Sequence, residues 1–128
     1  MPDRAEMSES KGRELTRNRA GGRCERCGHA GALEHAHRKS RAQGGGWEPS
    51  NALRLCRVCH GESHHRPEWS MEHGLMVPRG GDPATVPVHL LVWGQMPSRV
   101  LLDDEGQYEI LDILRRDDPT WPYLSPSR

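Results

Sequence analysis

Hydrophobic residues are sparse along this chain and occur in short groups, separated by glycine, proline and charged residues. Residues 11–20 are polar and basic and run into Gly21-Gly22, a usual helix stop, which predicts a short basic helix. Residues 33–38 lie between glycine-rich stretches and predict a short strand. Residues 49–55 predict a second short strand or a turn.

The middle of the chain predicts helix. Residues 58–65 suit a helix that stops at Pro67. Residues 68–77 would then extend the helical region, which should end at Gly74, with Trp69 and Leu75 packing back on a small core.

Strand-like hydrophobic groups return in the last third of the chain. The groups 88–93, 99–102 and 107–110, with an acidic turn at 103–106, predict a small antiparallel hairpin or three-stranded sheet. Asp103, Asp104 and Glu105 favour a solvated turn over a metal site. Both ends should be irregular, as a disordered arm over 1–10 and a tail over 117–128.

The composition leaves little apolar surface to bury. The 128 residues suffice for one small domain or a domain with an appendage; hydrophobic residues are 34%, aromatic residues 5%, and there is no Phe. A large enzyme is excluded. We therefore expect something besides a hydrophobic core to hold the fold together.

The formal net charge is zero, but the charge is unevenly distributed. Residues 11–66 hold twelve Lys/Arg against five Asp/Glu, a balance of +7, whereas 67–128 carry −5 and 1–10 carry −2. One strongly basic segment favours a polyanionic partner. No stretch approaches the roughly 18 to 20 apolar residues of a membrane span, and no signal-peptide core is visible, so we expect a cytoplasmic protein without a membrane partner.

The four cysteines form two pairs, Cys24-x2-Cys27 and Cys56-x2-Cys59, inside the basic segment. Two disulfides are the alternative in a secreted protein, but a two-residue gap suits adjacent corners of a metal tetrahedron. We predict a structural Zn²⁺ whose binding energy is folding energy, so that the segment loses its structure without metal.

Five of the eight histidines, His35, His37, His60, His64 and His65, fall within 31 residues. On a helix, His60 and His64 would share one face and could both reach one ion. On a strand, His35 and His37 would share a face as well. A second metal site is therefore geometrically available. The other three, His29, His73 and His89, are interpreted as solvated surface residues.

Three runs of the sequence carry a resemblance to a known family. They are Arg23-Cys24-Glu25-Arg26-Cys27-Gly28, then His37-Arg38-Lys39-Ser40-Arg41-Ala42-Gln43-Gly44-Gly45, then Ser50-Asn51-Ala52-Leu53-Arg54-Leu55-Cys56-Arg57-Val58-Cys59-His60. Over about residues 13–66 the chain resembles an HNH endonuclease of the zinc-stapled kind common in bacteriophage and actinobacterial genomes.

The resemblance implies an α+β fold with a small ββα-metal core, stapled by a zinc site of four cysteines. It divides the chain into an HNH nuclease domain over 11–78 and a short β-rich appendage, a C-terminal β-hairpin, with an irregular tail over 79–128. The setting would be the cytoplasm of a bacterium or a phage-infected host cell.

The resemblance also implies roles for three residues in a metal-dependent DNA endonuclease. His37 would be the general base that takes a proton from the attacking water. Asn51 would brace the loop that carries this histidine. His60 would bind one catalytic divalent ion, such as Mg²⁺, Mn²⁺, Ni²⁺ or Zn²⁺, which neutralises charge on the phosphate.

The chain departs from the family immediately before the general base. Many relatives have an Asp or His ligand there, and this chain has Ala36. Either His64 completes the ion site, or His35 or Glu34 reaches in from the strand, or phosphate and water hold the ion; His35 as the base with His37 as a ligand is a further alternative. Ala36 also favours the second functional hypothesis, a non-catalytic zinc-stapled nucleic-acid-binding module.

Basic residues around the site predict contacts with DNA phosphates. These residues are Arg38, Lys39, Arg41, Arg54 and Arg57, with Arg17 and Arg19 further out. Because no long recognition helix is visible, we expect low sequence specificity. We expect a monomer, with phage packaging proteins as candidate partners besides DNA.

Overall fold

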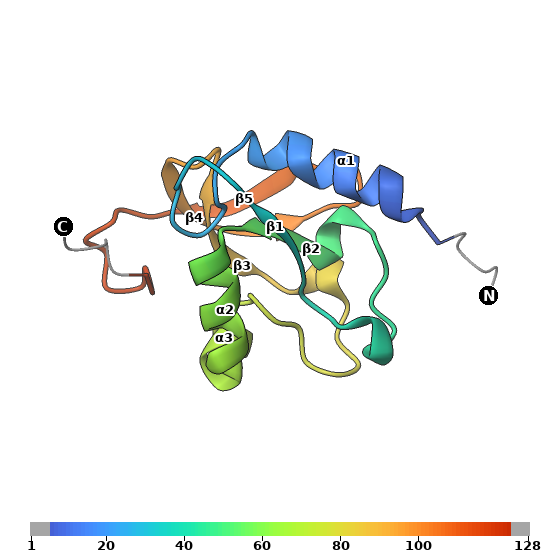
Figure 1. Ribbon diagram of the computed structural model, residues 1–128. Helices are drawn as coiled ribbons and strands as arrows, with labels where there is room; N and C mark the ends of the chain where they lie inside the picture. The colour runs from blue at the N-terminus through green and yellow to red at the C-terminus, as the bar shows by residue number, and fades with distance from the viewer. Residues whose placement is uncertain (1–5, 124–128) are drawn as a thin grey trace.

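The computed structural model describes residues 6–123, which form a small α+β domain (Figure 1). The N-terminal half contains α1 (Glu9–Ala20), β1 (Glu34–His37), β2 (Ala52–Leu55), α2 (Arg57–His65) and α3 (Pro67–Glu72). The C-terminal half contains β3 (Val88–Val92), β4 (Met96–Leu102) and β5 (Tyr108–Ile113). Single 3-10 turns occur at Arg41–Gln43, Pro49–Asn51 and Pro83–Thr85.

Helix α1 begins earlier than the sequence predicted. Ser8 caps it by accepting a hydrogen bond from the Lys11 amide at 3.1 Å, so residues 9 and 10 of the expected disordered arm are helical. Residues 1–5 of that arm lie outside the described residues. The predicted stop is confirmed: Gly21 adopts a left-handed conformation (φ 63°) and closes the helix.

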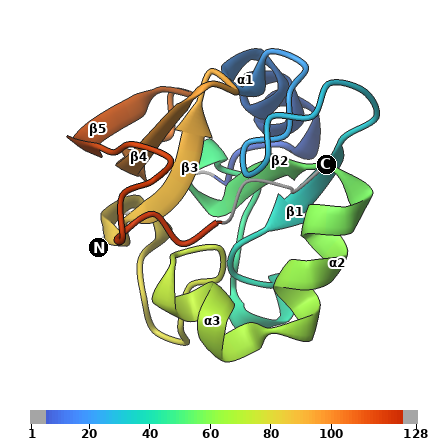
Figure 2. The same cartoon turned by 90° about the vertical axis from the view of Figure 1, so that its left-hand side faces the viewer.

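Strands β1 and β2 form an antiparallel ribbon in which Glu34 pairs with Leu55 and His37 with Ala52. Helix α2 follows β2 directly, and Pro67 both ends this helical segment and starts α3, because proline fits the first position of a helix. Figures 1 and 2 show α1 on one side of the ribbon and α2 with α3 on the other. The two sides of the ribbon therefore face different helices.

The C-terminal strands form an antiparallel sheet in the order β3-β4-β5, the three-stranded alternative of the prediction. One hydrophobic core joins this sheet to the ribbon, since Leu53 and Leu55 of β2 share it with Leu90 and Leu91 of β3 and with Val100. Strands from the region 79–128, predicted as an appendage, thus contribute residues to the same core as the ribbon.

The segment after β5 has no helix or strand among its described residues, as predicted, but it packs against the rest of the domain. Trp121 and Tyr123 are 6% and 5% exposed and belong to the core. The Tyr123 hydroxyl donates to the His89 carbonyl oxygen at 2.8 Å, which ties the segment to β3. Residues 124–128 of the predicted tail lie outside the described residues. Between residues 6 and 123, no helix combines the length and the apolar character that crossing a membrane requires.

Candidate metal centre and histidine sites

The four cysteines come together between the loop after α1 and the start of α2. All four Sγ atoms lie within 4.8 Å of one another, and those of Cys27 and Cys56 are 3.8 Å apart. Zinc–sulfur bonds of about 2.3 Å give a tetrahedral edge of about 3.8 Å, so the spacing fits. None of the four is in a disulfide. The cluster could hold a structural metal such as zinc, as the paired spacing predicted.

The surroundings of the cluster favour thiolate at one position. A hydrogen bond from the Cys59 thiol, together with backbone groups of Cys56, Cys27 and Arg26, lowers the pKa of Cys24 to about 5 against the opposing effect of burial. Burial raises the pKa of Cys27 to about 11. The charge of the Arg26 guanidinium acts on Cys59, and positive charge near sulfur suits a cluster that carries negative charge when it is metal-bound.

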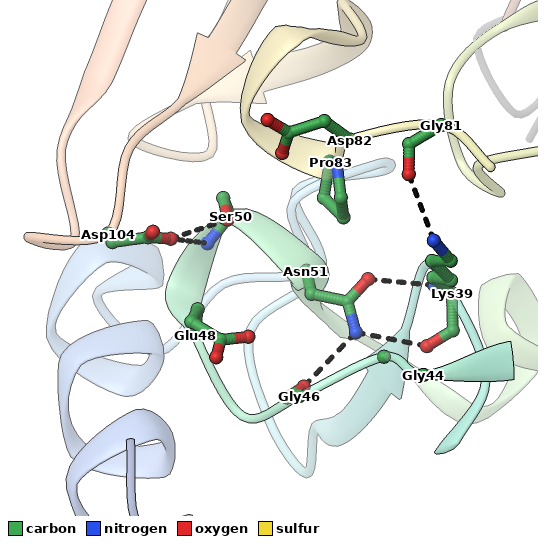
Figure 3. Close-up of a pocket in the computed structure, with 11 residues that line it drawn as sticks. Lys39, Gly44, Gly46, Glu48, Ser50, Asn51, Gly81, Asp82, Pro83 and Asp104 are labelled. Atoms are coloured by element: carbon green, nitrogen blue, oxygen red, sulfur yellow. Dashed lines mark hydrogen bonds between the residues drawn. The ribbon is translucent and has the colours of Figure 1, made fainter. Parts of the chain in front are cut away.

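Asn51 holds the loop that follows β1. Its side chain accepts a hydrogen bond from the Lys39 amide at 2.8 Å and donates to the carbonyl oxygens of Lys39 and Gly46 at 3.0 and 3.1 Å (Figure 3). Gly45 is required beside it, because a Cβ there would lie 1.8 Å from the Lys39 carbonyl oxygen. The amide therefore fixes both ends of the turn that begins two residues after His37.

His35 and His37 share the face of β1 that looks toward α1, with their ring centroids 5.2 Å apart. Both rings pack against Trp47, at 5.3 and 4.6 Å. The guanidinium carbons of Arg13 and Arg41 lie 5.0 and 5.8 Å from the Trp47 ring. We call these five residues the Trp47 cluster.

The histidines of the Trp47 cluster are held in the neutral form. Burial, followed by the charges of His37 and nearby arginines, lowers the pKa of His35 to about 3. Burial and then the charges of Arg41 and Arg13 lower the pKa of His37. Both ring nitrogens of His35 and the Nε2 of His37 are buried and make no hydrogen bond within the described structure. A neutral ring with an unused nitrogen can accept a proton.

The opposite face of β1 carries a different group. Glu34 Oε1 lies 2.8 Å from His60 Nδ1, and the rings of His60 and His64 are 5.0 Å apart at their centroids on α2. These three side chains have the chemistry of divalent-ion ligands. Within residues 6–123, however, the cysteine cluster is the one group of three or more such ligands gathered within 4.8 Å.

The structure does not bring His37 and His60 into one preformed site. His60 contacts Glu34 at the start of β1, whereas His37 ends β1, about 10 Å further along at 3.3 Å per residue. Residues three apart on a strand also face opposite sides. His35 lies on the same face of β1 as His37, so it does not contact His60. Glu34, the other strand residue considered as a ligand, does contact His60.

The predicted phosphate-contacting arginines have different environments. Arg38 is 2% exposed and donates to four backbone carbonyl oxygens, so the prediction that it contacts DNA is wrong. Arg19 is 5% exposed and paired with Glu25, so it is not a phosphate contact either. Arg41 remains exposed.

The remaining basic candidates lie nearer the surface. Lys39 is half-buried, with its Nζ donating to the Gly81 carbonyl oxygen, and Arg54 donates to the Leu33 carbonyl oxygen. Arg17 and Arg57 are exposed. Of these, the exposed side chains are free to meet a polyanion.

Two of the histidines expected at the surface are instead partly buried. Rings of Trp69, His73, His89, Trp121 and Tyr123 pack edge-to-face with centroids 4.9 to 6.4 Å apart, and we call them the C-terminal aromatic cluster. Burial lowers the pKa of His89 to about 4 and also lowers that of His73. Only His29 of the three is exposed, as predicted.

A cavity of about 330 Å³ lies beside the Asn51 loop (Figure 3). Lys39, Glu48, Asp82 and Asp104 contribute its charged lining, and Asp104 accepts a hydrogen bond from the Ser50 hydroxyl. Asp103 accepts from the amides of Glu105 and Gln107, which confirms the acidic turn. Sequence reasoning missed that Asp104 ties this turn to the start of the ribbon.

Sequence reasoning also missed Trp47 and Arg13. Trp47 stands in the glycine-rich stretch, where a lone aromatic residue among turn residues was the available signal. Arg13 reaches it because Gly12 lets the two backbones approach: a Cβ at Gly12 would lie 2.0 Å from the Trp47 carbonyl oxygen.

No protein-family model matches the chain, and neither does any curated protein or solved structure.

Proposed function

We propose that this protein is a metal-dependent DNA endonuclease of the HNH type, with His37 as general base. The observation that carries the proposal is Asn51, which binds both ends of the loop after His37 within a two-strand-and-helix unit held by four cysteines. Positioning the base through its loop is the role that the resemblance to HNH endonucleases implies for this asparagine. Low sequence specificity follows from the lack of a long exposed recognition helix within residues 6–123.

The state of His37 supports its role as a base. A general base must be unprotonated at working pH, and burial together with Arg41 and Arg13 lowers the pKa of this ring. The buried Nε2 atom makes no hydrogen bond within the described structure, so no protein group there occupies its lone pair. The two arginines supply positive charge beside it for a phosphate.

The divalent ion of this proposal would be held by His60, with His64 and Glu34 as the other ligands or supports. Glu34 already fixes the Nδ1 side of His60, which leaves Nε2 for an ion. The ion would neutralise charge on the phosphate and the leaving oxygen. Since Ala36 supplies no ligand on this face, we expect weak retention of the ion.

A second candidate function is a zinc-stapled nucleic-acid-binding module without catalysis. Ala36 and the separation of His37 from His60 on opposite faces of β1 favour it. The catalytic proposal requires His37 and the ion beside His60 to come together on one phosphodiester when nucleic acid binds. In the binding proposal the exposed arginines alone hold it.

The experiment that separates the two uses supercoiled plasmid with Mg²⁺, Mn²⁺, Ni²⁺ or Zn²⁺. The catalytic proposal expects ion-dependent nicking that falls at least about 100-fold in His37→Ala, the usual contribution of a general base. His29→Ala removes an exposed histidine and should cut like wild type. His35→Ala tests the alternative base.

The possible results point to different functions. Retardation of DNA without cutting under any ion supports the binding module. Equal cutting by wild type, His37→Ala and His35→Ala identifies a contaminating nuclease and removes the support for His37. Loss in His35→Ala with full activity in His37→Ala reassigns the base.

A further inference from the structure

Two carboxylates near the N-terminus form ion pairs with the arginines of the Trp47 cluster. Glu6 Oε1 lies 2.5 Å from Arg41 Nη1, and Glu9 Oε2 lies 2.8 Å from Arg13 Nε. Glu6 and Arg41 are 35 residues apart in the chain, so this contact is not a by-product of helix spacing. Both arginines belong to the cluster that holds the ring of His37.

The two guanidinium groups are arranged around one aromatic ring. Arg13 approaches Trp47 from α1, and Arg41 approaches it from the turn after β1. The His37 ring is 4.6 Å from Trp47. Stacking on an indole holds a guanidinium in place while its N–H groups stay available to an anion.

Carboxylate and phosphate oxygens are recognised by guanidinium in the same way, through charge-assisted N–H···O bonds. A carboxylate that pairs with such an arginine therefore marks a position that a phosphate oxygen can take. The pairs are open to exchange, since the side chains of Arg41 and Glu6 are 51% and 57% exposed, and exposed ion pairs are weak. A phosphodiester with several other contacts can displace them.

We propose that Arg13 and Arg41 form a phosphate subsite beside His37, and that Glu6 and Glu9 compete with nucleic acid for it. The inference rests on the proposed function for the identity of the ligand, a nucleic-acid phosphate. Arg13 was not among the residues expected to contact DNA, so the subsite adds a residue of α1 to the site. The acidic start of the chain then lowers the affinity for DNA in general.

The test measures binding of a fluorescent 20-base-pair DNA duplex in the His37→Ala background, without added divalent ion. Glu6→Gln/Glu9→Gln should bind about three- to tenfold more tightly, the factor expected when two exposed ion pairs stop competing. Glu14→Gln/Glu68→Gln removes the same charge from exposed side chains that do not contact the Trp47 cluster and is the matched control. It should gain less than about twofold.

A double-mutant cycle assigns the effect to the subsite. Arg13→Gln/Arg41→Gln should bind more weakly than the parent and should abolish the gain from the two glutamate substitutions. Equal gains in the glutamate variant and its control, or a gain that persists without the arginines, would overturn the proposal. Because Glu9 also favours the first turn of α1, Glu6→Gln alone is the variant that leaves the helix untouched.

Failure of this inference is distinguishable from failure of the proposed function. If wild type nicks DNA through His37 but the cycle shows no coupling, the subsite falls and the endonuclease stands. If wild type does not cut DNA under any ion while the cycle shows coupling, the phosphate subsite is supported, and it belongs to a binding module without catalysis.

Discussion

Arg38 shows how one residue can carry a different role from the one its neighbours suggest. It follows the proposed base in a basic stretch, yet its guanidinium donates to the carbonyl oxygens of Gly74, Ser50, Pro83 and Val86. Burial lowers its pKa to about 9, which still leaves it protonated at neutral pH. It therefore joins the ribbon to the segments before β3.

We predict that Arg38→Met lowers the free energy of unfolding by more than about 3 kcal/mol, because carbonyl groups that are buried here lose their donor. Urea unfolding followed by circular dichroism measures the change. Arg57→Met, at an exposed position on α2, should change stability by less than about 0.5 kcal/mol. Equal effects of the two substitutions would show that the Arg38 contacts contribute little.

At the residue scale, the spacing of residues in the sequence predicted the cysteine cluster, because the ligands of each pair are close together in the chain. Two Cys-x2-Cys pairs sufficed to predict a four-sulfur cluster, and the structure gathers those sulfurs. Arginine burial was not predictable in the same way. Arg38 is buried because segments from positions 50, 74, 83 and 86 converge on it, and nothing near Arg38 in the sequence encodes that convergence.

At the scale of elements, the C-terminal aromatic cluster joins α3, β3 and the segment after β5. His89 of β3 lies against His73, with Arg99 and Asp112 as the charged groups that act on it from β4 and β5. His73 in turn faces Glu72 and Arg66. Protonating either ring places charge among Trp121, Tyr123 and Trp69.

This packing predicts a loss of stability in acid. The pKa of His89 is about 4 when folded and near 6.5 when unfolded, so the unfolded chain binds the proton first as pH falls. Stability from this group is complete above about pH 6.5 and is lost as pH falls toward 4.

Thermal unfolding from about pH 7.5 to about pH 5 measures this effect. His89→Gln, which cannot take up the proton, should show a smaller fall in Tm over this range than wild type. His29→Gln, at an exposed position, should fall as wild type does. An unchanged fall in His89→Gln would contradict the role of this ring.

Element boundaries followed the local signals closely where caps were present. Gly21 and Pro67 placed the ends of α1 and α2, and the hydrophobic groups placed β3 to β5. The start of α1 was missed because a polar stretch reads equally well as a disordered arm or as an exposed helical turn capped by Ser8. The role of Trp121 and Tyr123 was missed because it depends on rings from distant elements.

For the whole molecule, the cysteine cluster lies within the common core that joins the ribbon to the three-stranded sheet. We predict that removing the metal unfolds both halves together. Structural zinc sites contribute about 10 to 16 kcal/mol, which is as large as the whole stability of a small domain, about 5 to 15 kcal/mol.

The measurement is circular dichroism of the metal-loaded protein during titration with a chelator. One cooperative loss of helix and strand signal, reversed by added Zn²⁺, is expected. Chelator already saturated with Zn²⁺ is the control and should have no effect. Retention of the β signal after the helix signal is lost would instead show that the C-terminal sheet folds alone.

The sequence by itself determined what depends on neighbours in the chain: the cysteine pairs, the helix stops, the strand segments and the uneven charge. Only the tertiary structure decided which arginines are buried, that Glu34 rather than His35 meets His60, and that Trp47 gathers Arg13, Arg41 and His37. The physical reason is that a strand turns successive side chains to opposite faces, and what each face meets is set by helices and loops far away in sequence.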